Sequence, residues 1–303
     1  MSVRVTVEQM AIPLQLILTK AILLLLLCLA MPVAIAAEAD NAKEEETEPL
    51  WEWRLAAFGH YGPYYPASED YQLNIIPVPY PIYRGKFLRL GDDREKPITG
   101  RVFRRDRIKL DFSFGLNFSG DSDDIDARTG MPDLDLLLEV GPELEMEFAR
   151  RAVFDGRWFL SLEVRPAFSF DGLDPTYQGI VMSPELSYLK KLPRLKDELK
   201  IRLTPTFANG KYMDFFYTVD PIFAAPGRPA FEADGGYLGT DLSISFLKSI
   251  NESFELLFGT RLSSHHGAAN DKSPLYTEDM TFSVYMAFSW KFWESERREI
   301  VMD

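Results

Sequence analysis

The sequence predicts an all-β fold: an antiparallel up-and-down β-barrel of twelve strands, or of ten if its weakest pair of strands is left out. Three observations lead to this prediction. Apolar and polar residues alternate along most of the chain, the alternating segments are long, and the connections between them alternate in size. A period of two residues is typical of a β-strand, because successive side chains point to opposite faces.

The stretch "DRIKLDFSFGLNFSG", residues 106–120, shows the alternation most clearly. Apolar side chains hold the even positions from Ile108 to Phe118, and polar or small ones hold the odd positions from Lys109 to Ser119. The same pattern predicts the remaining strands, and no stretch has a convincing helical stripe. In chain order the predicted strands are 51–59, 71–83, 86–91, 98–104, 108–118, 134–148, 158–170, 180–188, 199–207, 238–246, 254–262 and 282–292. The weak pair is 86–91 and 98–104.

Strand length distinguishes two environments that both produce this alternation. Strands of soluble sandwiches average about 5–6 residues, whereas a tilted strand that crosses a membrane needs about 9–11. Most of the predicted segments reach the longer figure, and aromatic residues such as Trp158, Tyr188 and Trp290 stand near their ends. We therefore expect a transmembrane barrel in an outer membrane, with apolar faces toward lipid and polar faces toward the lumen.

The connections set the orientation of the barrel. Shorter segments alternate with mostly longer ones, as in outer-membrane barrels, which have short periplasmic turns and longer outer loops. The predicted periplasmic turns are 149–156, 190–198 and 248–253, and the predicted outer loops are 119–133, 171–179, 208–236 and 263–279. The last strand is expected to descend toward the periplasm.

The N-terminal segment predicts export. Residues 1–37 have a basic start, an apolar run and small residues near Ala37, which is typical of a cleaved secretory signal peptide. Residues 38–50 predict a disordered acidic leader, 51–292 the barrel and 293–303 a polar periplasmic tail. The only cysteine, Cys28, lies in the signal peptide, so no disulfide is expected in the barrel. The net charge of −13 argues against a nucleic-acid partner.

Two groups of residues are candidates for binding. The predicted topology puts a set of basic residues on the periplasmic rim, where they would meet an acidic partner or form an ordinary solvated edge: Arg104, Arg105, Arg150, Arg151, Lys190, Lys191, Arg297 and Arg298. The second group belongs to the aromatic-rich loop 208–236. Tyr217, Arg228 and Phe231 are expected in an inward-folded lid, with Arg228 paired to the acidic lumen face, or else in the interfacial girdle. Acidic residues of 121–126 would contact lipopolysaccharide through divalent cations or would be ordinary solvated loop charges.

Several motifs resemble the MltA-interacting protein/outer membrane protein V family. They are "PVPYPIYRG" (77–85), "LLLEVGPELE" (136–145) and a C-terminal third with Tyr217, Val219, Ala224 or Ala225, Arg228, Gly236 and Ser273-Pro274. The resemblance covers most of 51–292. It implies an outer-membrane protein of a Gram-negative cell, and one member is a scaffold that joins a lytic transglycosylase to a peptidoglycan synthase. The chain departs from the usual barrel pattern because it continues past the aromatic Phe292.

The sequence favours a non-enzymatic scaffold that contacts murein hydrolases and synthases. A narrow diffusion channel for small solutes is the first alternative. A barrel lipid hydrolase is the second, with Ser264 as nucleophile, His266 as base and Glu278 or Asp279 as the orienting acid. His265 and His266 are adjacent on a strand and diverge, so no metal site is expected, and no cofactor motif is present.

Overall fold

The computed structural model describes residues 47–85, 89–90, 100–105, 107–150, 156–192 and 197–300. The strands are β1 (Thr47–Pro49), β2 (Trp51–Pro63), β3 (Tyr71–Arg84), β4 (Arg89–Leu90), β5 (Gly100–Arg105), β6 (Ile108–Asn117), β7 (Leu136–Arg150), β8 (Arg157–Asp171), β9 (Asp174–Lys191), β10 (Glu198–Ala208), β11 (Gly236–Ser249), β12 (Phe254–Ser264), β13 (Met280–Glu294) and β14 (Arg298–Ile300). The helices are η1 (Ser122–Asp124), η2 (Asp126–Arg128), α2 (Gly210–Tyr217) and η3 (Pro221–Phe223). Within these ranges no helix is long and apolar enough to cross a membrane.

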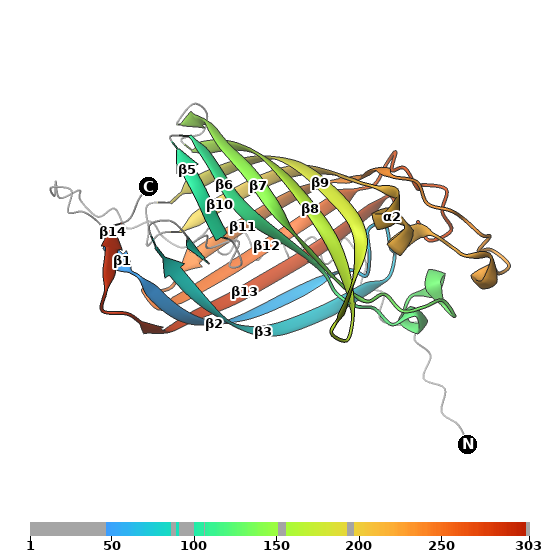
Figure 1. Cartoon of the computed structure of the whole chain (residues 1–303), viewed down its shortest axis with the longest axis horizontal. Coiled ribbons are helices and arrows are strands. Elements are labelled where there is room, and N and C mark those ends of the chain that lie inside the picture. The colour runs from blue at the N-terminus through green and yellow to red at the C-terminus, as the bar shows by residue number, and fades with distance from the viewer. Residues whose placement is uncertain are drawn as a thin grey trace, which may run out of the picture. The chain divides into compact units, whose positions relative to one another are not determined.

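The described strands β2 to β13 form one antiparallel sheet that curls until β13 pairs with β2 (Figure 1). Ten of them are long, and β4 and β5, with two and six residues, complete the ring. The prediction of an all-β antiparallel fold is confirmed. Each predicted segment overlaps a strand, and the weak pair of the sequence analysis corresponds to the two short strands.

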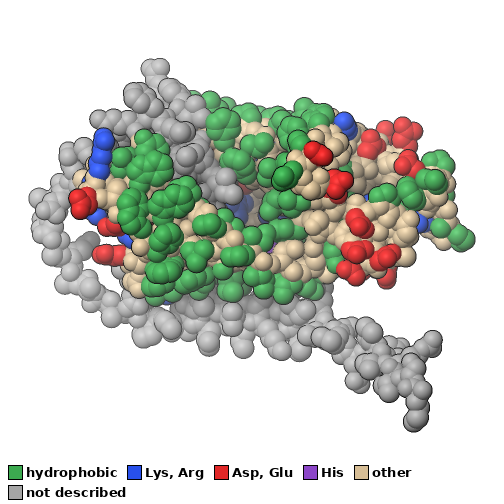
Figure 2. Space-filling model, turned by 60° about the horizontal axis from the view of Figure 1, so that its bottom comes forward, with side chains coloured by type: hydrophobic (Ala, Val, Ile, Leu, Met, Phe, Trp, Pro, Cys, Tyr) green, Lys and Arg blue, Asp and Glu red, His purple; other side chains and the backbone are tan. Residues whose placement is uncertain are grey.

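The strands bury their polar side chains and expose their apolar ones, which is the reverse of the arrangement in a soluble protein. In β6, Phe112 and Phe114 are 45 % and 41 % exposed on the outside, while Asp111 and Ser113 are 4 % and 1 % exposed on the inside. The same alternation continues around the ring, so that large apolar side chains cover the outer wall (Figure 2). Glutamates, serines and arginines fill the interior. The alternation seen in the sequence therefore has its apolar face outward.

One predicted loop is wrong. Residues 171–179 were expected to form an outer loop, but β8 and β9 continue through most of this segment and leave only Gly172 and Leu173 as a two-residue turn between Asp171 and Asp174. Gly172 has φ of 64°, which a two-residue hairpin turn of this kind requires and glycine adopts without strain. The hairpin therefore projects as a ribbon instead of an irregular loop.

Two short segments that flank the barrel strands form strands that the sequence did not predict. Residues 47–49, assigned to a disordered leader, form β1, and residues 298–300, assigned to a polar tail, form β14. The two strands pair with each other in a separate two-stranded sheet, with Glu48 opposite Glu299. Leu50 N–H adds a hydrogen bond to Arg297 O at 2.8 Å. The ribbon thus joins the two ends of the barrel chain.

Candidate functional site

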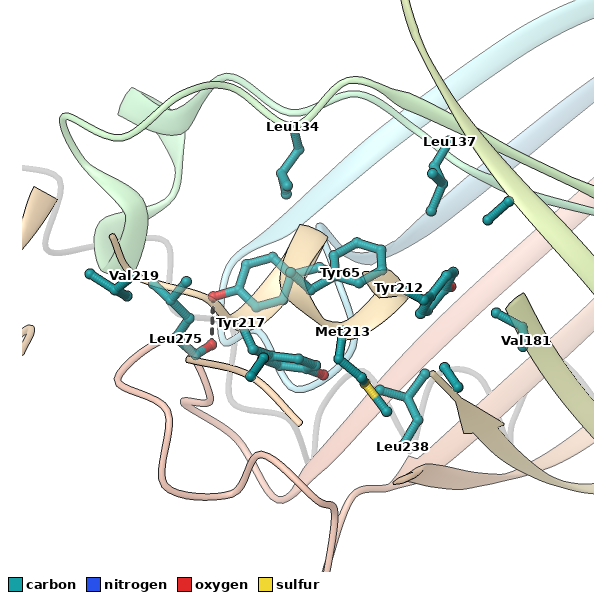
Figure 3. Close-up of a cluster of buried hydrophobic side chains, with 14 of the residues drawn as sticks. Tyr65, Leu134, Leu137, Val181, Tyr212, Met213, Tyr217, Val219, Leu238 and Leu275 are labelled. Carbon is teal, nitrogen blue, oxygen red and sulfur yellow. Dashed lines mark hydrogen bonds between the residues drawn. The ribbon is translucent and has the colours of Figure 1, made fainter. Parts of the chain in front are cut away.

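The two ends of the barrel differ in their connections. One end, here called the loop end, carries residues 64–70, 118–135, 209–235 and 265–279. The same end carries the two-residue turn between β8 and β9. The other end, the turn end, carries connections such as 250–253 and the β1–β14 ribbon. Apolar side chains from all four loops meet in one buried cluster (Figure 3). We call these packed loops the cap.

Helix α2 lies at the centre of the cap. Asn209 begins the helix: its side-chain Oδ1 accepts hydrogen bonds from Tyr212 N at 3.2 Å and from Ile180 N at 3.0 Å, the second of which ties the helix to β9. The buried face consists of Tyr212, Met213, Phe216 and Tyr217, each 3 % exposed or less. This spacing places one apolar stripe of a short helix against the inner surface of the barrel mouth.

A buried polar contact anchors α2 to the barrel wall. Tyr212 Oη donates a hydrogen bond to Glu139 Oε1 at 2.7 Å, and Arg165 Nε lies 2.9 Å from Glu139 Oε2. Burial, and next the Glu139 carboxylate, raise the pKa of Tyr212 well above its usual value, so the phenol remains a donor. Gly115 leaves room for Glu139, because a Cβ at Gly115 would stand 2.6 Å from Glu139 Oε2.

Two further tyrosines join the loops to one another. Tyr65 Oη donates to Leu275 O at 2.7 Å, the bond drawn in Figure 3, and Tyr217 Oη donates to Pro66 O at 2.8 Å. Burial raises the pKa of Tyr65 to about 12. Ser273 Oγ donates to Tyr217 O at 2.7 Å, so three of the four loops are connected by buried hydrogen bonds.

The structure places the three candidate lid residues in this cap. Tyr217 is buried, and Phe231 is partly buried and bridges Val219 through backbone hydrogen bonds. The expectation for Arg228 is wrong. Its guanidinium does not pair with the acidic lumen face; among the described residues it donates to the carbonyl oxygens of Phe223, Ala127 and Thr129, the last at 2.9 Å. Arg228 thereby holds two outer loops together from the outside of the cluster.

His265 is a buried residue that links loops of the cap, a role that its sequence position does not indicate. Its Nδ1 lies 3.1 Å from Leu238 O, and its Nε2 accepts from Ala67 N at 3.2 Å and lies 3.1 Å from Thr281 Oγ1. These partners require a proton on Nδ1 and none on Nε2. Burial lowers the pKa of His265, which favours this neutral form. Ala67 O in turn accepts from Thr277 N and Glu278 N.

The structure does not bring Ser264, His266 and an acidic residue together as the triad that a hydrolase would need. His266 is largely exposed, and its Nδ1 lies 3.5 Å from Asp279 Oδ2. Ser264 is a strand residue opposite Thr240 and Met280, and in this fully described part of the chain no hydrogen bond joins its hydroxyl to His266. His265 and His266 do diverge, one inward and one outward. No cluster of three acidic, histidine or cysteine side chains in the described ranges has metal-site geometry.

The predicted rim residues that the structure describes lie at the turn end. Lys190 and Lys191 end β9, and Arg297 and Arg298 are exposed at the β1–β14 ribbon. Arg104, Arg105 and Arg150 end β5 and β7, but their side chains, and all of Arg151, lie outside the described residues. Arg298 contacts Glu294 at 3.8 Å, so this part of the rim carries both signs of charge.

The described lumen wall below the cap is mainly polar, with a few buried apolar side chains such as Phe159 and Leu247. Arg54 pairs with Glu52 at 3.0 Å and with Glu255, while Arg84 pairs with Glu52 at 2.9 Å and Glu48 at 2.7 Å. Farther around the ring, Arg202 Nη2 donates to Tyr285 Oη at 3.1 Å. Sequence alternation places these residues on the inner face, but their pairing depends on which strands become neighbours.

Fold and site together define a class: a closed antiparallel barrel with an apolar outer wall, a charged lumen and one end filled by a packed cap. Comparison with protein families matches residues 55–292 to the MltA-interacting protein MipA family. The chain belongs to that family, as the resemblance in the sequence indicated. No curated protein matches the chain. One similar solved structure is a bacterial polysaccharide outer membrane secretin, with 10 % identity, a TM-score of 0.41, and coverage of 80 % of this chain and 99 % of that one.

Proposed function

We propose that this protein is an outer-membrane barrel that acts as a non-enzymatic scaffold for enzymes that remodel peptidoglycan. The observation that supports the membrane location is the inverted burial of the strands. Apolar side chains such as Leu144 and Leu160, 49 % and 47 % exposed, cover the wall, whereas Glu143 and Glu163 are 4 % and 9 % exposed inside. In water this arrangement would leave a large apolar surface uncovered, while in lipid it is the stable one.

The scaffold role rests on the family name and on the division of the barrel into two ends. A protein that interacts with MltA, a murein hydrolase, meets it on the periplasmic side, which we assign to the turn end. That end carries the exposed cations Lys191, Arg297 and Arg298 and the β1–β14 ribbon. Such charges increase the rate of encounter with an acidic partner and are screened over about 8 Å at physiological salt.

The diffusion-channel alternative is less compatible with the cap. Phe216 and Tyr217 are each 1 % exposed in a cluster that closes the loop end around α2. A solute would have to displace this cluster to pass. The polar lumen favours a channel, but the closed mouth favours a protein that does not conduct in its resting state.

The scaffold proposal is tested by capture of partners from solubilised envelopes. We expect the wild-type chain to retain a murein hydrolase, with retention that decreases as salt rises. Replacing Lys190 and Lys191 by glutamate should weaken retention, whereas the matched change Lys272→Glu, on an exposed residue of the loop end, should not. Equal retention by all three proteins at every salt concentration would contradict a role for the turn-end cations.

A further inference from the structure

A cavity of about 140 Å³ lies inside the barrel beneath the cap. Tyr65, Pro66 and His265 of the cap bound it from above, and residues of β2, β6 and β10 to β13 form its walls. All of these lining residues belong to the described part of the chain. A cavity of about 150 Å³ can hold a molecule of the size of benzene. The space therefore fits several waters or one ligand of about six heavy atoms.

Short inward side chains on three neighbouring strands leave this space open. The register of β11, β12 and β13 places Ser263 between Asp241 and Thr281, and it places Ser283 directly opposite Arg261. All five residues line the cavity. Because serine and threonine side chains are short, the two charged side chains stand beside open space instead of packing against a neighbour.

The two charged side chains of the cavity, Arg261 and Asp241, are only loosely paired. Arg261 Nε lies 3.6 Å from Asp241 Oδ2, which is longer than a hydrogen bond. Neither side chain makes another ion pair or a hydrogen bond with the described residues. Elsewhere in the lumen, Arg54 and Arg165 lie 3.0 Å and 2.9 Å from carboxylate oxygens. Arg261 and Asp241 therefore keep hydrogen-bonding capacity for a ligand.

The part of the lining nearest the cap is largely apolar. Tyr65 and Leu238, which belong to the buried cluster of the cap (Figure 3), line the cavity together with Pro63 and Pro66. The Tyr65 hydroxyl already donates to Leu275 O. An ionised group is costly to bury against such a surface. A ligand would therefore turn its charged atoms toward Arg261 and Asp241 and its apolar atoms toward the cap.

We propose that this cavity binds a small α-amino acid with an apolar side chain, of the size of alanine. The ligand carboxylate accepts hydrogen bonds from the Arg261 guanidinium, its ammonium donates to the Asp241 carboxylate, and its methyl group packs against Tyr65 and Leu238. Hydrogen bonds between ionised groups are stronger than neutral ones. A ligand with a single charge would satisfy only one member of the pair. The proposal goes beyond the scaffold role and does not depend on it.

The test is isothermal titration calorimetry of the full chain, folded in detergent micelles. L-alanine and D-alanine are measured separately. Propionate and ethylamine are the matched probes, because they correspond to alanine without its ammonium and without its carboxylate. We expect at least one alanine enantiomer to bind about tenfold or more tightly than either probe, since each probe loses a hydrogen bond between charged groups.

Variants of the cavity show where the ligand binds. Arg261→Gln and Asp241→Asn should each weaken alanine binding by about tenfold or more. Ser263→Leu fills the cavity without changing its charge and should have the same effect. The matched control is Arg157→Gln, which removes a lumen cation that lies 4.0 Å from Glu147 and does not line the cavity, and it should leave binding unchanged. The urea midpoint of each variant verifies that it is folded.

Three outcomes would overturn the proposal. If the folded wild type binds neither enantiomer, the cavity holds water only. If propionate or ethylamine binds as tightly as alanine, the two charges do not act together on one ligand. If Arg261→Gln and Ser263→Leu bind alanine as the wild type does, or if Arg157→Gln weakens binding equally, the ligand lies elsewhere on the protein.

Discussion

Phe114→Arg tests whether the outer wall faces lipid. Phe114 is in the middle part of β6 with its side chain 41 % exposed on the outer face, while the adjacent Ser113 is 1 % exposed inside. Arginine on the lipid face of a barrel costs about 2–4 kcal/mol at the bilayer midplane and less toward the interfaces. That range lowers the folding equilibrium constant by roughly 30- to 700-fold.

The assay for this prediction is urea unfolding in phosphatidylcholine vesicles, followed by tryptophan fluorescence. The control is Asn117→Arg, on the inner face of the same strand, where the new cation would face Glu139; Asn117 Nδ2 lies 3.4 Å from Glu139 Oε1. We expect a much lower midpoint for Phe114→Arg and a small change for the control. Equal losses would show that both faces have the same surroundings and would refute the lipid assignment.

Three further predictions concern the cap. Phe216→Asp puts an unpaired charge into the cluster at a residue 1 % exposed, so planar-bilayer recordings should show openings that the wild type and the exposed control Lys211→Asp lack. Tyr212→Phe removes the hydrogen bond to Glu139 and should lower the free energy of unfolding by about 1.5–3 kcal/mol; an unchanged urea midpoint would contradict the anchoring role. Because burial lowers the pKa of His265 below its ordinary 6.5, the detached loop binds more protons than the packed one, so cap stability should fall as pH drops below about 6.5. Hydrogen exchange of residues 64–70 should show this loss, and His265→Gln should abolish its pH dependence.

The sequence was most informative where a property depends on neighbouring residues. Phe112, Phe114 and Leu116 alternate with Asp111 and Ser113, and this local pattern was sufficient to predict the strand and its two faces. The prolines at 77–81 also carried a signal, because proline inside a predicted strand indicates an edge. In the structure, the described partner of β3 on that side is β4, a strand of only two residues.

The cap could be predicted only in outline. An aromatic-rich segment suggested an inward fold, but the contact of Tyr212 with Glu139 joins residues 73 positions apart and depends on the register of β6 to β9. Arg228 was expected to pair with carboxylates because of its charge, yet it lies where backbone carbonyls of two loops converge. The pairing of β1 with β14 joins segments about 250 residues apart, and no local sequence pattern indicates it.

The pairing of the first and last long strands has a consequence for biogenesis. On the side away from β3, β2 pairs with β13, which lies more than two hundred residues later, and the β1–β14 ribbon adds further pairing at the same junction. Contacts of such long sequence separation form slowly, because the intervening chain must be ordered first. Until β13 has emerged, the nascent sheet has open edges and an apolar face that would promote aggregation in an aqueous compartment. The chain must therefore be kept unfolded or escorted until its synthesis is complete, and truncations that remove only β13 should be degraded instead of accumulating as shorter barrels.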